Sequence, residues 1–234
     1  MRTEDGAEAL AATQVVADAA RDAIGRARAQ RDELLVLASH DIKNAVGIMD
    51  SALGMLEEMP EQAAQMQGMM RRATHRLLIL VQAMVDVDLL QREVMPLTPA
   101  DASWGTIVAP VVEGALATAA TKEIDVVPAG DQTERVACDA TLVGRMLAAL
   151  VEHAIGNAPA KSVVEVRGAR VGDGRFVAHV AHRGRAVGAG TLDKLFTTLP
   201  LRFCRLAAIR HGGALRAVSP LADGVGVAFE LELP

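Results

Sequence analysis

One histidine with polar neighbours at helical spacing offers the clearest chemistry in this chain of 234 residues. The group consists of His40, Asp41, Lys43 and Asn44. In a helix, Lys43 and Asn44 follow His40 by three and four residues, which places both within reach of its side chain. A neutral imidazole is a nucleophile near neutral pH, and a carboxylate beside it can fix its tautomer. The group predicts an imidazole available for chemistry, against the alternative of an ordinary surface histidine.

The element that must position this group is a helix over residues 31–59. Its apolar residues recur at an unbroken alternation of three and four, which is typical of an amphipathic helix with a narrow seam. They are Leu35, Ala38, Ile42, Ala45, Met49, Ala52, Leu56 and Met59. At 100° per residue, His40 lies about 200° round from Ile42 and so faces away from the seam. Residues adjacent in a helix do not face one another, so a contact between His40 and Asp41 requires a suitable rotamer.

A second helix is expected from Pro60 to about Gln91, because proline suits the start of a helix better than its interior. One stripe of this helix is apolar, and Leu78, Val81 and Val85 widen it beyond what a single partner helix covers. A two-helix hairpin cannot bury this much apolar surface alone. We therefore expect two hairpins to pair as a four-helix bundle, which makes the protein a homodimer. His75 on this helix is interpreted as a solvated or hydrogen-bonded residue.

The helical hairpin is expected to be preceded by a helical lead and followed by a linker and a second domain. Residues 1–30 are rich in alanine and predict an N-terminal helical lead that runs into the helical hairpin of residues 31–95; the first six residues could instead be frayed. Pro96 and Pro99 mark a linker. Residues 101–234 form the remaining domain.

Helices and short strands alternate in residues 101–234. The predicted helices span 103–121, with Ser103 as cap and Pro110 as a kink or break, 139–157, with Asp139 as cap, and 201–210. The predicted strands span 124–127, 135–138, 162–170, 176–182, 214–218 and 226–233. The third and fourth form a hairpin around Gly172-Asp173-Gly174, and the last two form a second hairpin. Helices interleaved with antiparallel hairpins indicate a two-layer α/β sandwich.

Composition excludes several classes of protein. The 24 basic and 29 acidic residues give no electrostatic footprint for nucleic acid. No apolar run approaches the roughly 18 residues of a membrane span, and the N-terminus lacks a signal-peptide core. Cys138 and Cys204 are isolated and lack metal-ligand spacing. The sequence thus predicts a reduced, cytoplasmic protein without nucleic-acid or membrane partners.

Residues 32–35 and 40–44 resemble the phosphoacceptor box of bacterial sensor histidine kinases. That box reads His, acid, hydrophobe, base, then Thr or Asn, then Pro; here Ala45 replaces the proline. The resemblance covers roughly residues 30–234 and implies a dimeric four-helix bundle followed by an ATP-binding domain. It implies that His40 is the phosphoacceptor and that Asp41 raises its nucleophilicity. The charge of Lys43 would offset phosphate charge, and by the same resemblance Asn44 orients water when a receiver domain is dephosphorylated.

In residues 101–234 the order of elements resembles that of the family's ATP-binding domain, but the family's functional residues are missing. Ala149 and His153 stand where the family has two magnesium-binding asparagines, and His182 stands where a carboxylate reads adenine. Pro200 replaces a glycine of the last glycine-rich box and removes an N–H donor. The loop that normally covers ATP is almost wholly absent. We therefore expect ATP binding to be lost and no cofactor to be held; any Mg²⁺ would be carried by receiver partners.

Two other uses of these residues carry less weight. Gly184, Gly188 and Gly190 lack the Lys-Ser/Thr that follows a phosphate loop. Glu152, His153 and His182 could hold a metal only if the fold gathers them, and nothing in their spacing favours a metal site.

The predicted function is phosphorelay in two-component signalling. His40 would pass a phosphoryl group between response-regulator receiver domains without ATP-dependent autophosphorylation, as histidine phosphotransferases with a vestigial kinase domain do. The alternatives are a non-catalytic pseudokinase scaffold that binds a receiver domain or a kinase, a divergent ATP-dependent histidine kinase, and a bundle protein with an unrelated binding activity.

Overall fold

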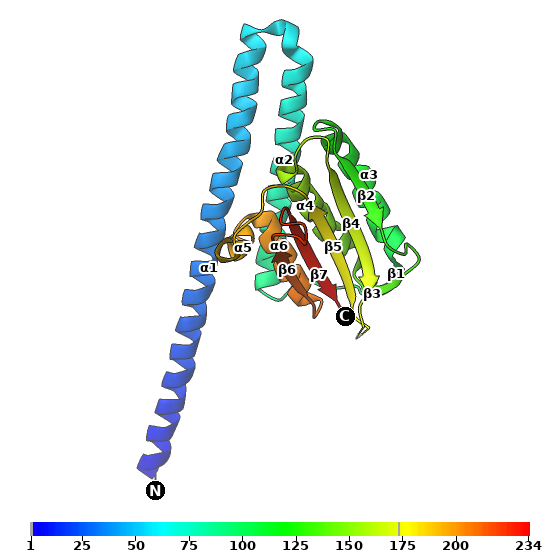
Figure 1. The fold of residues 1–234 in the computed structure, drawn as a ribbon. Coiled ribbons are helices and arrows are strands. Elements are labelled where there is room, and N and C mark those ends of the chain that lie inside the picture. The colour runs from blue at the N-terminus through cyan, green and yellow to red at the C-terminus, as the bar shows by residue number, and fades with distance from the viewer. Residues whose placement is uncertain (1, 173) are drawn as a thin grey trace. The chain divides into compact units, whose positions relative to one another are not determined.

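The computed structural model describes residues 2–172 and 174–234, and the chain divides into two compact units, one ending at Thr74 and one from His75 to Pro234. A helical hairpin comes first and an α/β sheet with covering helices follows, as Figure 1 shows. The predicted fold class, a hairpin followed by a two-layer α/β sandwich, is confirmed.

The first unit contains one long helix and the start of a second. Helix α1 spans Arg2–Glu58 without a break, so the lead of residues 2–30 and the helix that carries His40 are one element; Met1 lies outside the described residues. A 3-10 turn, η1 (Pro60–Gln62), connects α1 to α2 (Ala63–Gln91). The proline thus opens the second helical segment, as expected.

The buried stripe of α1 differs by one residue from the predicted seam. Leu34, Ala38, Ala45 and Ala52 are buried, whereas Leu35 is 41% exposed. Leu34 lies four residues before Ala38 and Leu35 lies three before it. By spacing alone, both share the face of Ala38. Strict alternation of three and four favours Leu35, but residues three and four before Ala38 both lie on its face, and the structure buries Leu34.

The second unit begins within α2. Its residues Leu80, Ala83, Val87 and Leu90 are buried. On the same helix Leu78, Val81 and Val85 remain 65%, 53% and 49% exposed in the single chain. These are the three residues that the sequence assigned to a stripe too wide for one partner helix.

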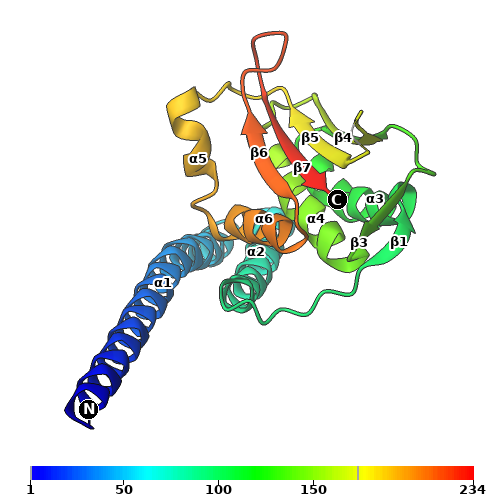
Figure 2. The same cartoon turned by 90° about the horizontal axis from the view of Figure 1, so that it is seen from below.

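A five-stranded mixed sheet forms one layer of the second unit, in the order β2-β4-β5-β7-β6. Only the β2–β4 pair is parallel. Helices α3 (Trp104–Ala120), α4 (Ala140–Asn157) and α6 (Leu199–Arg210) lie side by side as the second layer, which Figure 2 shows from below. The strands are β2 (Asp125–Ala129), β4 (Val163–Arg170), β5 (Phe176–His182), β6 (Ala214–Val218) and β7 (Val227–Leu233).

Both predicted helix caps are confirmed. The N–H of Thr106 donates to Ser103 Oγ at 3.4 Å, and the N–H of Leu142 donates to Asp139 Oδ1 at 2.9 Å. Asp139 also accepts from the backbone N–H of Thr98 at 3.1 Å. Burial alone would raise the pKa of the Asp139 carboxyl, but the hydrogen bonds from Leu142 and Thr98 outweigh it and lower the pKa.

The structure departs from the sequence reading at four places. Part of the expected linker is a strand, β1 (Ala100–Ser103), which pairs with β3 (Arg135–Cys138). Pro110 lies inside α3 without dividing it. A short turn, η2 (Ala189–Thr191), and a short helix, α5 (Leu192–Leu195), occupy the glycine-rich bend. Helix α6 begins at Leu199, with Pro200 in its first turn, where proline is tolerated. Asp173, in the expected turn between β4 and β5, lies outside the described residues.

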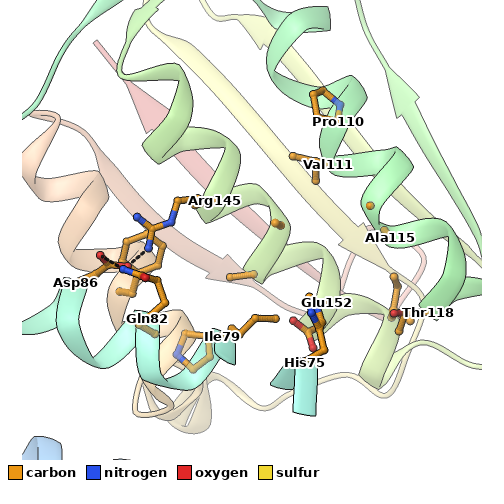
Figure 3. Close-up of a pocket in the computed structure, with 17 residues that line it drawn as sticks. His75, Ile79, Gln82, Asp86, Pro110, Val111, Ala115, Thr118, Arg145 and Glu152 are labelled. Atoms are coloured by element: carbon orange, nitrogen blue, oxygen red, sulfur yellow. Dashed lines mark hydrogen bonds and ion pairs between the residues drawn. The ribbon is translucent and has the colours of Figure 1, made fainter. Parts of the chain in front are cut away.

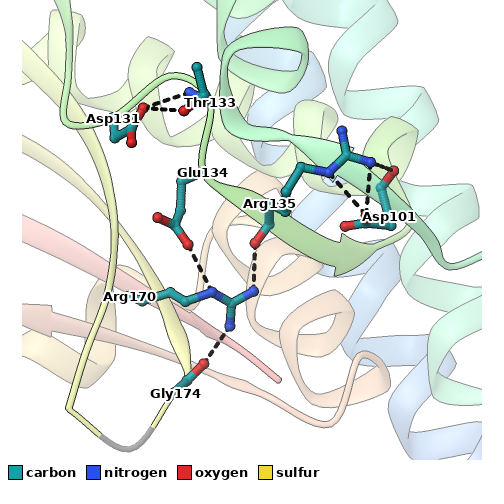
Figure 4. A network of polar contacts seen from close by, with 7 residues as sticks. All are labelled: Asp101, Asp131, Thr133, Glu134, Arg135, Arg170 and Gly174. Carbon is teal, nitrogen blue, oxygen red and sulfur yellow. Dashed lines mark hydrogen bonds and ion pairs between the residues drawn. The ribbon is translucent and has the colours of Figure 1, made fainter.

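A polar network explains why the linker is ordered as β1. Asp101 of β1 pairs with Arg135 of β3, with 2.8 Å between nitrogen and oxygen. The backbone oxygen of Arg135 accepts from Arg170 of β4, and Arg170 also pairs with Glu134 at 2.8 Å (Figure 4). The network thus joins the small β1–β3 sheet to the end of the large sheet.

None of the described helices combines the length and apolar character of a membrane span.

Candidate functional site

The imidazole of His40 is the centre of the candidate site on α1. Its side chain is 76% exposed, while that of Asp41 is only 17% exposed. His40 Nδ1 lies 3.3 Å from Asp41 Oδ1 and 3.4 Å from Asn44 Nδ2. The rotamers therefore allow the contact between sequence neighbours that helix geometry alone does not supply.

The two contacts at Nδ1 constrain the tautomer of His40. If Nδ1 carries the proton it donates to Asp41, and the Asn44 amide can then add a hydrogen bond only through its oxygen. If Nδ1 is unprotonated it accepts from the Asn44 NH₂ group but faces the Asp41 carboxylate without a proton between them. A carboxylate only accepts hydrogen bonds, so it favours the first arrangement, which leaves the lone pair of Nε2 free. His40 Nε2 makes no hydrogen bond within the described residues.

Lys43 and three residues of the preceding turns surround the imidazole. A shallow depression on α1 is lined by Leu35, Val36, Ser39, His40 and Lys43. Val36 is 70% exposed, so an apolar flank lies on one side of the imidazole and a cation on the other. Sequence reasoning missed this flank, because Leu35 was assigned to the seam and Val36 fitted no stripe. An apolar side chain four residues before an exposed histidine was the available signal.

A second group of histidines lies in the α/β unit, where the sequence led us to look for a nucleotide site. The His153 ring on α4 packs edge-on against Phe229 of β7, with 5.3 Å between ring centroids. Its Nε2 lies 3.3 Å from Asn157 Nδ2. Burial, and then the charge of His182, lower the pKa of His153 to about 4. This ring is therefore neutral near pH 7.

His182 at the end of β5 is buried. Its Nδ1 accepts a hydrogen bond from the N–H of Gly184 at 3.1 Å, so the proton resides on Nε2, which has no partner. Burial lowers the pKa of His182. A buried neutral imidazole with one nitrogen occupied cannot replace a carboxylate that accepts two hydrogen bonds.

The start of α6 offers few donors to an anion. Thr198 stands at the N-cap without a side-chain capping bond, and Pro200 in the first turn has no N–H. Ala149 and His153 on α4 carry no side-chain oxygen and Pro200 offers no backbone donor, whereas a magnesium–nucleotide complex needs oxygen ligands and N–H donors.

Glu152 does not join the two histidines. It lines a separate cavity together with His75. Within residues 2–172 and 174–234, no three His, Cys, Asp or Glu side chains are grouped as a metal site. Cys138 and Cys204 are buried free thiols.

Comparisons with known proteins identify the fold but no family by sequence. No protein-family model matches the sequence, and no curated protein matches it either. Solved structures do match. One is the histidine kinase AdeS of Acinetobacter baumannii, at a TM-score of 0.63 and 15% identity, over 83% of this chain and 96% of that one.

Two further similar structures are longer than this chain. Full-length ShkA in complex with AMPPNP aligns at a TM-score of 0.61 and 19% identity, over 87% of this chain and 45% of that one. The histidine kinase ThkA in complex with the response regulator TrrA aligns at a TM-score of 0.62 and 18% identity. The alignment covers 86% of this chain and 61% of that one. At such identities the likeness establishes that this chain has the histidine kinase fold of helical hairpin plus ATP-binding domain.

Proposed function

We propose that this protein is a histidine phosphotransferase of cytoplasmic two-component signalling, with His40 as the phosphoacceptor. The observation that carries the proposal is the exposed imidazole whose Nδ1 contacts Asp41 and Asn44 while Nε2 remains unbonded. It lies on a helix of a fold shared with histidine kinases.

The transfer step needs no group beyond those on His40 and the partner. The Nε2 lone pair attacks the phosphorus of an aspartyl phosphate on a receiver domain, and an N–P bond forms as the P–O bond to the aspartate breaks. The receiver's carboxylate leaves with that electron pair. The Nδ1 proton stays on the imidazole, where Asp41 stabilises the positive charge that develops on the ring. Lys43 lies beside His40 and offsets phosphate charge, and the reverse reaction delivers the group to a second receiver.

The partners follow from the surface around the imidazole and from the hairpin. ThkA, which shares the fold, is solved in complex with a response regulator, and the apolar flank of Leu35 and Val36 suits such a contact. The exposed residues Leu78, Val81 and Val85 favour a homodimer in which two hairpins form a four-helix bundle. Mg²⁺ for the chemistry would be held by the receiver.

We further propose that the α/β unit does not use ATP. The neutral rings of His153 and His182 and the proline in the first turn of α6 support this proposal. The competing function is a divergent ATP-dependent histidine kinase, which is favoured by one observation: ShkA, with the same fold, is solved in complex with AMPPNP. A third reading, a scaffold that binds a receiver or kinase without transfer, predicts complex formation without label on His40.

Phosphotransfer profiling separates these three functions. The purified protein is incubated with receivers phosphorylated on aspartate with radiolabelled phosphate, and separately with γ-labelled ATP. The proposal predicts acid-labile label from at least one receiver and none from ATP. Label from ATP would establish the divergent kinase. Receiver binding without label would establish the scaffold.

A further inference from the structure

A cavity of about 340 Å³ lies within the second unit, lined by residues of α2, α3, α4 and the start of α6. Figure 3 shows its lining side chains. The volume lies in the range of small-molecule sites, roughly 300–1,000 Å³. Nothing in the proposed phosphotransfer needs this cavity, because His40 lies on α1.

The middle of the cavity is apolar. Ile79 of α2, Val111 and Ala115 of α3, and Ala149 of α4 contribute small or aliphatic side chains. Gly114 adds further space, since a Cβ built there would meet nothing within 4 Å. This part would accept a hydrocarbon chain or a ring, and it offers no hydrogen bond to a polar group.

One end of the cavity is closed by an ion pair that is already complete. Arg145 of α4 pairs with Asp86 of α2, whose side chain is 3% exposed. Gln82 donates to the other oxygen of Asp86 at 3.1 Å, and the Arg145 guanidinium stacks over Phe203 at 5.1 Å. Since the two charges neutralise one another, this end attracts neither anions nor cations strongly.

The other end holds a carboxylate that lacks a hydrogen bond. Glu152 of α4 is half-buried and forms no hydrogen bond or ion pair within the described residues. Burial raises its pKa, and the charges of His75 and Arg76 act in the opposite direction without closing an ion pair. A half-buried carboxylate that no hydrogen bond satisfies is costly, even with these positive charges nearby. A ligand that brings an N–H donor and a positive charge would satisfy it.

The spacing of the two ends sets the length of the ligand. Arg145 and Glu152 are seven residues apart on α4, which corresponds to about 10 Å along the helix axis at 1.5 Å per residue. A chain or ring system of about six to eight heavy atoms spans that distance.

We propose that this cavity is a binding site for a small organic cation, an alkyl or arylalkyl amine whose ammonium group pairs with Glu152 and whose apolar body lies between α2, α3 and α4. The cavity thus gives the protein a ligand input separate from the chemistry of His40.

Calorimetric titration of the protein with matched probes tests the charge preference. Hexylamine, hexanol and hexanoate share one apolar body and differ in the terminal group. Hexylamine should bind saturably, at least tenfold more tightly than hexanol, and hexanoate should bind most weakly. Binding of hexanoate at least as tight as that of hexylamine, or no amine binding at millimolar concentration, would overturn the proposal.

Two pairs of variants locate the site. Glu152→Gln should weaken hexylamine binding at least tenfold and leave hexanol binding unchanged, whereas Glu113→Gln, at an exposed glutamate of α3 outside the cavity, should change neither.

Gly114→Leu should fill the cavity and abolish binding of both probes. Gly144→Leu, which also enters open space but does not line the cavity, should preserve both. Should Gly114→Leu fail to fold, the Glu152 pair decides, and equal effects of Glu152→Gln and Glu113→Gln would refute the assignment.

Discussion

Nδ1 of His40 lies 3.3 Å from Oδ1 of Asp41, the next residue of α1, although successive side chains on a helix point about 100° apart. The contact joins an exposed ring to a carboxylate that is largely covered. It orients the imidazole with Nε2 toward solvent, where another protein can approach it. The nitrogen proposed to react and the carboxylate proposed to support it thus come from two adjacent positions of one helix.

Replacing His40 with glutamine should abolish transfer from a phosphorylated receiver, because the variant lacks the nucleophile. The side chain is exposed, so the free energy of unfolding should change by no more than about 0.5 kcal/mol. His75→Gln, an exposed histidine of α2, should keep full transfer. Gel assays of label and thermal melts measure both effects. Label on the His40→Gln protein would contradict the assignment of the phosphoacceptor.

Asp41→Asn should slow acceptance by about 10²-fold, because the amide oxygen still accepts from Nδ1 but no longer stabilises positive charge on the ring. Single-turnover rates against one receiver measure this loss. A variant as fast as the wild type would mean that the contact is only structural.

Asn44→Ala should retain acceptance but slow any dephosphorylation of the receiver, because this position is expected to orient water and not to bond phosphorus. Release of inorganic phosphate from the labelled receiver is the measurement. Equal loss of acceptance and of phosphate release would show that Asn44 positions the imidazole itself.

Sequence spacing could name His40, Asp41, Lys43 and Asn44, because they follow one another on one helix. It could not supply the apolar flank, since exposure of Leu35 and Val36 depends on where the buried stripe begins. Among the residues of α1 whose burial is described, Leu34 is the first buried one, and a residue four before Ala38 shares its face as a residue three before it does.

Mg-ATP should neither bind nor label the protein. Each missing ligand removes a hydrogen bond or charge contact, worth on the order of 1–3 kcal/mol for charged groups. Calorimetry and incubation with γ-labelled ATP provide the measurements, with an active histidine kinase as positive control. Self-phosphorylation would instead favour the divergent kinase.

Size-exclusion chromatography with light scattering should give about twice the chain mass of 24.6 kDa at micromolar protein. Val81→Glu should weaken the dimer, because it places a charge within the exposed apolar stripe of α2. Leu116→Glu on α3 is the matched control, since Leu116 is 55% exposed and lies outside the hairpin. A folded wild-type monomer at these concentrations would remove the argument for a four-helix bundle.

The stability of the α/β unit should fall in mild acid. The pKa of His153 is about 4 when folded and near 6.5 when unfolded, so the unfolded state binds more protons between these values. Stability is complete above pH 6.5 and decreases as the pH falls toward 4, by at most about 1.4 kcal/mol per pH unit for one group. Urea midpoints at several pH values should show this slope. It should be smaller in His153→Gln.

Local signals predicted most elements of the α/β unit, because caps such as Ser103 and Asp139 act within one turn. They failed where a distant strand decides the outcome. Residues 100–103 form β1 because β3 supplies backbone partners for them and Arg135 of β3 pairs with Asp101, as Figure 4 shows. Pro110 was expected to kink or divide the helix, and it does not divide α3, which packs against α4 and β2 and remains continuous.

Helix α2 runs without interruption from Ala63 to Gln91, although the boundary between the two compact units falls at residues 74 and 75. An uninterrupted α-helix resists both bending and twisting, since every turn is held by its backbone hydrogen bonds. An amine bound between Ile79 of α2 and Glu152 of α4 would contact the same helix α2 whose first turns belong to the hairpin unit. Because α2 is continuous, we expect a ligand bound in the proposed site to act on the same helix whose first residues belong to the hairpin unit.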